Sequence, residues 1–141
     1  MRRWIIVLAL VLLGGLVTIQ FVPINTSNPP VTGDVPSSAA VKAVLRRACY
    51  DCHSNETEWP WYSRIAPISW WVARDVRKGR AELNFSTWDQ YSTKQRVKKL
   101  KETSETVAEG EMPPWFYLPA HRDARLSAED RALLKGWARE P

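Results

Sequence analysis

The longest hydrophobic stretch of the chain runs from residue 4 to residue 22, WIIVLALVLLGGLVTIQFV, without a single charge. A helix of this length spans about 28 Å, close to the ~30 Å hydrocarbon core of a bilayer. Arg2 and Arg3 precede it, and such a basic pair stays on the cytoplasmic side. The pattern predicts a single inner-membrane anchor over residues 1–22, with the rest of the chain in the periplasm. A cleaved signal sequence is the alternative, although the run is long for one and no Ala-x-Ala site follows it.

The next segment, residues 23–38, reads PINTSNPPVTGDVPSS and keeps no amphipathic period. Its four prolines, set among Ser, Thr and Asn, favour an extended backbone without a hydrophobic face. We therefore predict a Pro-rich linker that holds a domain of residues 39–141 away from the bilayer.

Beyond the linker the apolar positions recur at helical spacing, and no stretch alternates with period two for long. A first helix is predicted over residues 39–50, with Ser37 or Ser38 as its N-cap. Its buried side is expected to consist of Val41, Val44, Leu45 and Ala48. A second helix is expected to begin at Pro67, because proline is favoured in a first turn, and to end at about Gly79.

Two further helices are predicted in the second half of the chain. The run from Ser86 to Asp89 resembles a capping box, which would open a third helix that continues to about Ala108 and stops at Gly110. Its apolar face is expected to consist of Val97, Leu100 and Val107. Three prolines then predict an ordered, non-helical loop over GEMPPWFYLPAH. A last helix starts at Ser127 and carries Leu133, Leu134 and Trp137. The predicted fold class is an all-α domain with long loops.

Composition then excludes some classes of partner. The 141 residues carry 20 Lys and Arg against 15 Asp and Glu, a formal net charge of +5. The only basic run spans residues 94–101, so we do not expect nucleic-acid binding. We interpret this run as the solvated face of the third helix, with a docking face for an acidic redox partner as the alternative. Eight tryptophans in so short a chain indicate a large, flat apolar group to be wrapped.

The sequence Cys49-Tyr50-Asp51-Cys52-His53 carries the clearest chemical signal. Cysteines at i and i+3 near a helix end point the same way, so each can form a thioether with one vinyl group of a haem. The histidine that follows can ligate the iron from the proximal side. C-x-x-C-H is the pattern of c-type haem attachment, and export would bring it to the compartment where such haem is attached. The motif predicts one covalent haem c.

Three other structures fit parts of this motif. A thioredoxin-like redox pair requires a C-x-x-C beside a βαβ pattern, which this helical sequence lacks. A zinc site requires a further ligand, and His121 is the only other histidine. A disulfide between Cys49 and Cys52 would close a strained four-residue loop.

Haem iron commonly has a second axial ligand, from His, Met or solvent. Met112 and His121 are the candidates, because the only other methionine is Met1. Pro113 and Pro114 follow Met112, exclude a core helix there and stiffen its backbone. His121 lies among charged residues and is expected to be an exposed turn residue without a partner for its ring. We predict Met112 as the distal ligand, with a core filler as the alternative role.

Aromatic and basic residues downstream of the motif are candidates for the haem surroundings. The side chains expected to line the haem and screen it from water are Trp59, Trp61, Trp70 and Trp71. The same side chains could instead form the core of a domain with few aliphatic residues. Arg64 and Arg74 are candidates for pairing with the haem propionates, or with nearby carboxylates.

The order of these blocks resembles the bacterial haem-binding domain family of small, membrane-anchored, cytochrome-c-like proteins. The resemblance covers residues 41–138 and rests on C-x-x-C-H followed in order by WPWYS, NFS-x-W and GEMPP. It implies a cytochrome-c-like helical domain, with haem linked to Cys49 and Cys52 and His53 as an axial ligand. Met112 falls where class I cytochromes c place their distal methionine. The resemblance implies haem binding but no particular pathway.

Together these observations predict a single-haem domain that passes single electrons at the periplasmic face of the inner membrane to an unknown redox partner. No base or nucleophile beside a substrate cavity is signalled, so an electron carrier is favoured over an enzyme. A haem-based sensor or gas-binding module, with an open or displaceable distal position, is the first alternative. A haem peroxidase is the second, and His121 is its only distal acid–base candidate.

Overall fold

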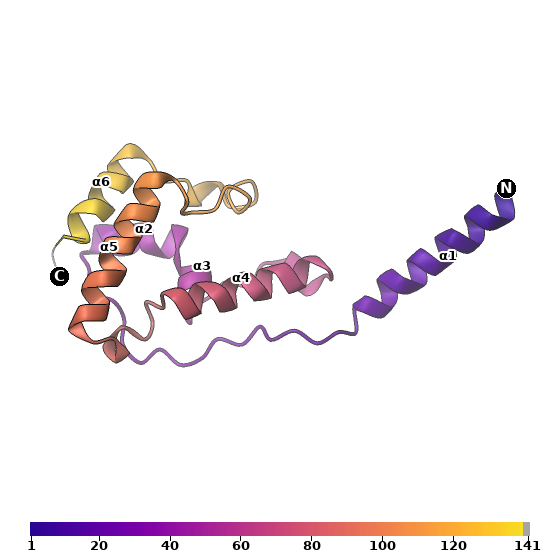
Figure 1. Ribbon diagram of the computed structural model, residues 1–141, viewed down its shortest axis with the longest axis horizontal. Helices are drawn as coiled ribbons and strands as arrows, with labels where there is room; N and C mark the ends of the chain where they lie inside the picture. Colours follow the sequence, from indigo (N-terminus) through magenta and orange to yellow (C-terminus); the bar gives the residue numbers. More distant parts are fainter. Residues whose placement is uncertain (140–141) are drawn as a thin grey trace.

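The computed structural model describes residues 1–139, and the regular elements within that range are helices. Figure 1 shows an N-terminal helix joined by an extended segment to a group of shorter helices. The α-helices are α1 Arg2–Ile19, α2 Ala39–Ala48, α3 Tyr50–His53, α4 Ile68–Glu82, α5 Thr93–Glu109 and α6 Ala128–Trp137. Short 3-10 turns lie between them at η1 Trp61–Arg64, η2 Trp88–Gln90 and η3 Arg122–Ala124. The predicted all-α class is confirmed for these residues.

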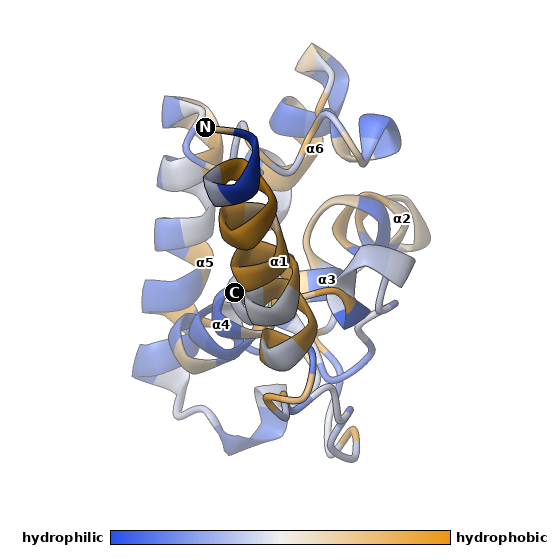
Figure 2. Cartoon of the chain, turned by 90° about the vertical axis from the view of Figure 1, so that its right-hand side faces the viewer, coloured by the Kyte–Doolittle hydropathy of each residue, from blue (hydrophilic) through white to orange (hydrophobic). Residues whose placement is uncertain are grey.

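Helix α1 stands apart from the other helices, and none of its side chains is buried. After its first turn it is apolar or weakly polar on every side (Figure 2). Its length and composition are sufficient to cross a membrane. A helix that is hydrophobic all round needs apolar surroundings, which the other described residues do not supply to α1. The structure is therefore compatible with the predicted single span.

The proline-rich segment after α1 has an extended backbone but is not separate from the domain. Gly33 forms an isolated bridge with Thr87, and Val35 is 3% exposed within the hydrophobic core. The Trp137 indole N–H donates to the carbonyl of Pro36 over 3.0 Å. The second half of this segment is thus packed on the domain, and its composition alone gave no sign of that packing.

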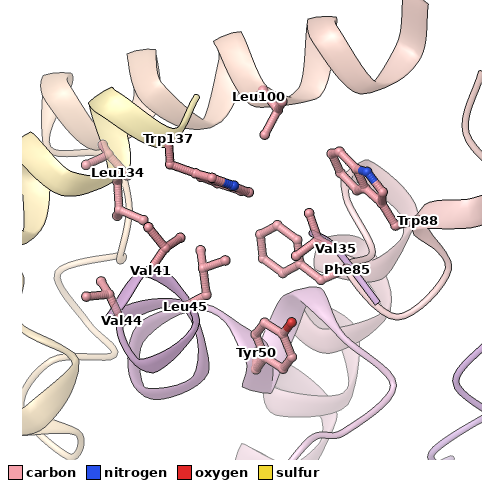
Figure 3. Packing of buried hydrophobic residues seen from close by; sticks show 11 residues of the cluster. Val35, Val41, Val44, Leu45, Tyr50, Phe85, Trp88, Leu100, Leu134 and Trp137 are labelled. Carbon is pink, nitrogen blue, oxygen red and sulfur yellow. The ribbon is translucent and has the colours of Figure 1, made fainter. Parts of the chain in front are cut away.

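The hydrophobic core lies between α2, α5 and α6, at the end of the domain that is remote from α1 (Figures 1 and 3). Leu45, Phe85 and Leu134 are at its centre, with at most 1% of each exposed. The complete cluster consists of Val35, Val41, Val44, Leu45, Tyr50, Phe85, Trp88, Leu100, Val107, Leu134 and Trp137. The predicted buried side of the first helix is confirmed, because all four of its residues are buried.

Local signals at helix ends agree with the structure at three places. The Ser38 side chain accepts a hydrogen bond from the backbone N–H of Val41 and caps α2. Ser127 and Asp130 form a reciprocal capping box at the start of α6. Gly110 ends α5 in the left-handed conformation, with φ 79°, where a side chain would be strained.

The predicted start of the third helix was wrong. Helix α5 begins at Thr93, and its capping box is formed by Ser92 and Gln95 instead. The Ser86 hydroxyl accepts a hydrogen bond from the backbone N–H of Asn55, so a distant loop takes the side chain that was expected to cap the helix. Val97 was placed on the apolar face but is 47% exposed.

Candidate functional site

The C-x-x-C-H motif forms a sharp corner of the chain. The helix predicted over residues 39–50 is interrupted at Cys49, whose φ of −130° and ψ of −35° end α2. A single new turn, α3, follows, in which the backbone N–H of His53 donates to the Cys49 carbonyl over 2.9 Å. Cys49 and Cys52 therefore flank one turn of helix, and both are free, half-buried thiols.

Both thiols are held in their protonated form. Burial raises the pKa of Cys49 and of Cys52 to about 12. The neighbouring carboxylates of Asp51 and Asp75 add to the effect at Cys52. Thiol–disulfide exchange requires a thiolate, so this environment counts against a thioredoxin-like use of the pair.

The His53 ring is oriented by a backbone carbonyl. Its Nδ1 lies 3.1 Å from the carbonyl oxygen of Leu83. A carbonyl can only accept, so Nδ1 carries the proton and Nε2 keeps its lone pair. Burial lowers the pKa of His53, which favours this neutral form. A neutral imidazole with its second nitrogen fixed by a carbonyl is the usual arrangement of a metal-ligating histidine.

The segment that holds His53 is also bonded to the loop that follows it. The backbone N–H of Phe85 donates to the His53 carbonyl over 2.8 Å, so residues 83–85 contact His53 at both its ring and its backbone. Asn84 donates to the Asn55 side chain over 2.8 Å, and Ser86 accepts from the Asn55 backbone over 2.9 Å. These buried polar groups satisfy one another. Sequence reasoning assigned no role to Asn55 or Asn84, and it expected Ser86 to cap a helix.

Helix α4 approaches the motif at a glycine. A Cβ at Gly79 would lie 2.5 Å from the Cys52 carbonyl oxygen and 3.0 Å from the Cys52 Cβ. The prediction that Gly79 ends this helix was wrong, because α4 continues to Glu82. The glycine instead allows the C-terminal part of α4 to pack directly on the turn that carries the motif.

A hydrogen-bonded set of side chains connects the motif to the loop between α5 and α6. Tyr117 donates its hydroxyl proton to Asp51, the third residue of the motif, over 2.7 Å. The His121 ring stacks on Tyr117 with centroids 3.8 Å apart, and its Nδ1 lies 3.1 Å from the Tyr117 carbonyl. Its Nε2 lies 3.2 Å from the Tyr62 hydroxyl of η1. The expectation that His121 is an exposed turn residue without a partner was therefore wrong.

Comparison with known proteins identifies the family. The sequence matches the haem-binding domain family over residues 14–140. The chain belongs to the haem-binding domain family. Searches of curated proteins and of solved structures found no match.

The tryptophans predicted around the haem differ in exposure within the haem-binding domain. Trp59 and Trp70 are half-buried, whereas Trp61 is 75% and Trp71 67% exposed. The Trp59 indole donates to Asn28 of the extended segment over 3.2 Å. The indole nitrogen of Trp70 is buried and has no hydrogen-bond partner among the described residues. Their contact with haem stays a prediction.

The remaining predicted site residues lie on the surface of the haem-binding domain. Met112 is 36% exposed, and its backbone N–H donates to the carbonyl of Thr106 over 3.3 Å. Pro113, which follows it, is buried. Arg64 and Arg74 are exposed. The structure thus places Met112 on an anchored loop with a free side chain.

The two most distinct cavities of the haem-binding domain lie away from the motif. One, of about 180 Å³, is formed by the core end around Trp88 and Leu100, and the other, of about 320 Å³, lies beside Pro113 and Trp115. Cys49, Cys52 and His53 line neither.

Proposed function

We propose that this haem-binding domain carries one covalent haem c, linked to Cys49 and Cys52 with His53 as the proximal ligand, and that it transfers single electrons. We place it at the periplasmic face of the inner membrane, anchored by α1. The observation that carries the proposal is the hydrogen bond between His53 Nδ1 and the Leu83 carbonyl, which leaves Nε2 as the ligating nitrogen. Membership of the haem-binding family supports it.

The donor set fits a c-type haem. Two protonated thiols flank one helical turn, and a neutral imidazole follows directly. The buried indole N–H of Trp70 lacks an acceptor among the described residues, and a haem propionate is an acceptor of the required charge. When bound, haem supplies a reversible one-electron iron couple. The chain's own part is to orient His53 through Leu83 and to hold Cys52 against α4 at Gly79.

We propose Met112 as the distal ligand. The left-handed Gly110 and the buried Pro113 fix the loop on either side of Met112, while its thioether stays partly exposed. His121 is the weaker candidate because its Nε2, the nitrogen that would ligate the iron, already faces the Tyr62 hydroxyl. The same engagement counts against a peroxidase, which would need a free distal acid–base group.

Covalent attachment is tested on the full chain expressed with a cytochrome c maturation system. Haem staining of a denaturing gel should follow the polypeptide, and haem should resist acid–acetone extraction. Cys49→Ala combined with Cys52→Ala should abolish both results, whereas Val97→Ala, at an exposed site on α5, should leave both intact. Free extraction of haem from the unaltered chain would exclude c-type attachment.

Topology is tested separately with reporter fusions after Pro141. An alkaline phosphatase fusion should be active and a reporter that works only in the cytoplasm should be silent, because Arg2 and Arg3 retain the N-terminus inside. A soluble periplasmic product that starts near Asn25 would show that the apolar segment is cleaved.

A further inference from the structure

Two separate segments at the end of the domain next to α1 expose large apolar side chains. The first segment, η1 and the start of α4, exposes Trp61, Ile65, Ile68 and Trp71, and the second, the loop between α5 and α6, exposes Trp115 and Phe116. We call these six residues the aromatic face. Trp115 is 81% exposed and Ile68 44%. A gathering of this kind on a folded domain marks an interaction surface.

The end of α1 is clamped to this face by one side chain. The Gln20 amide nitrogen donates to the carbonyl of Ala66 over 3.1 Å, and the Ala66 N–H donates to the Gln20 amide oxygen over 2.9 Å. Ala66 is 7% exposed, so Gln20 satisfies both backbone polar groups of a buried residue. Ala66 lies in the turn between η1 and α4, directly beside Ile65.

The hydrogen bonds between Gln20 and Ala66 would fix the depth of the aromatic face relative to a bilayer that α1 spans. An 18-residue helix is about 27 Å long, which nearly matches the ~30 Å hydrocarbon core. Gln20 follows that helix immediately, so Gln20 and Ala66 lie at the boundary between hydrocarbon and headgroups. Ile65 and Ile68 lie within two residues of Ala66 along the chain.

The domain extends away from this boundary with its core end outermost. Figure 1 shows the N-terminal end of α4 and the loop between α5 and α6 on the side from which α1 departs, with α2, α5 and α6 farther away. Figure 2, viewed from that side, shows α1 in front of the domain. A bilayer around α1 would therefore meet both segments of the aromatic face.

We propose that the aromatic face rests in the headgroup region of the bilayer that α1 spans, so that the domain docks on lipid in one orientation. This inference rests on the proposed membrane anchor. Tryptophan is enriched at the depth of the headgroups, where its ring is apolar and its N–H is solvated. The exposed Arg64 of η1 adds a cation next to Trp61, which favours anionic headgroups.

The test uses the full, haem-loaded chain in vesicles of phosphatidylethanolamine and phosphatidylglycerol. A photoreactive benzoylphenylalanine replaces Ile68 or Trp115 of the face, or Val97 on α5 as the matched exposed control. Lipid adducts at Ile68 and Trp115 should be several-fold more abundant than at Val97. Gln20→Ala should lower the Ile68 adducts several-fold while retention in carbonate-washed membranes stays unchanged.

Other adducts or equal yields overturn the proposal. Equal lipid labelling at the three sites would show that the domain does not dock on the bilayer. Adducts with a second copy or with the haem would assign the face to a dimer or to the haem pocket. Haem staining and carbonate retention are recorded on the same samples. Loss of staining with the lipid pattern intact would reject the proposed haem attachment alone, and loss of retention would reject the anchor and the docking together.

Discussion

The two ends of the domain use their aromatic residues in opposite ways. At the end remote from α1, Phe85, Trp88 and Trp137 are buried against aliphatic side chains of α2, α5 and α6. At the end next to α1, Trp61 and Trp115 are exposed. The chain fills the core at one end with its own side chains, whereas the other end exposes apolar surface that, in our proposals, contacts haem and lipid. Stability and function are therefore expected to depend on different residues.

The turn that carries the C-x-x-C-H motif lies between these two ends. Tyr50 extends from α3 into the core, where its ring stacks on Phe85 at 5.4 Å. The Asp51 carboxylate accepts a hydrogen bond from Tyr117, which lies in the loop between α5 and α6. One turn of helix therefore connects a well-packed core to an exposed surface. This arrangement would hold Cys49, Cys52 and His53 rigidly at an open site.

The largest expected effect on stability comes from a substitution in the hydrophobic core. Phe85→Ala should lower the free energy of unfolding by about 3–5 kcal/mol, because it removes a fully buried ring. Trp115→Ala, at an exposed aromatic of the other end, should change it by less than about 0.5 kcal/mol. Thermal or denaturant unfolding of the two variants measures the contrast, and similar losses in both would contradict the comparison.

At the end next to α1, the largest effect should be a change in the spectrum and reduction potential of the proposed haem iron. Met112→Ala should remove the ferric sulfur-to-iron charge-transfer band, lower the reduction potential and open the site to carbon monoxide. His121→Ala should leave all three nearly unchanged, since the ring nitrogens of His121 bond to Tyr62 and the Tyr117 carbonyl. Absorption spectra and potentiometry distinguish the two variants. The reverse pattern would transfer the ligand role to His121, and no effect from either would favour an open sensor site.

The contact between Gly79 of α4 and Cys52 should be sensitive to one added methyl group. Gly79→Ala should cost about 1–3 kcal/mol and reduce the yield of attached haem, because the new Cβ would collide with the Cys52 backbone. Gly136→Ala in α6 is the matched control, since no atom lies within 4 Å of its added Cβ. That variant should be neutral or more stable by up to about 1 kcal/mol. Equal behaviour of the two variants in unfolding and haem staining would refute this contact.

The smallest expected effect concerns pH at the core end. The Arg47 guanidinium, 2.5 Å away, and the Ser127 N–H lower the pKa of Asp130 below its ordinary value. A lowered folded-state pKa adds stability above the ordinary pKa near 3.9, and this is lost as the pH falls through the folded value. Asp130→Asn should therefore cost about 1 kcal/mol or less at pH 7 and almost nothing once the pH is below both the ordinary and the lowered pKa. Glu109→Gln, at an exposed position of α5, serves as the control. A cost that does not vary with pH would show that the ion pair contributes nothing.

Much of this protein was readable from sequence because short-range physics determines it. A charge-free run of nineteen residues predicts an apolar helix, and α1 is such a helix with no buried side chain. Ser38, Ser127 and Gly110 act on backbone groups within a few residues of themselves, so their helix ends were predicted correctly. The C-x-x-C-H spacing likewise places its three reactive groups within a single helical turn, wherever that turn lies in the fold.

Only the tertiary structure decided what meets that turn. The carbonyl of Leu83 is 30 residues from the His53 ring it orients, and the Tyr62 hydroxyl is 59 residues from His121. Gly79 resembled a helix stop in sequence, but inside α4 it serves as a contact surface for Cys52. Ser86 resembled a helix cap, but Asn55 uses its hydroxyl. Each of these roles depends on a partner that folding brings close, and neither propensity nor periodicity encodes which distant group will satisfy a buried polar atom or fill the space beside a missing Cβ.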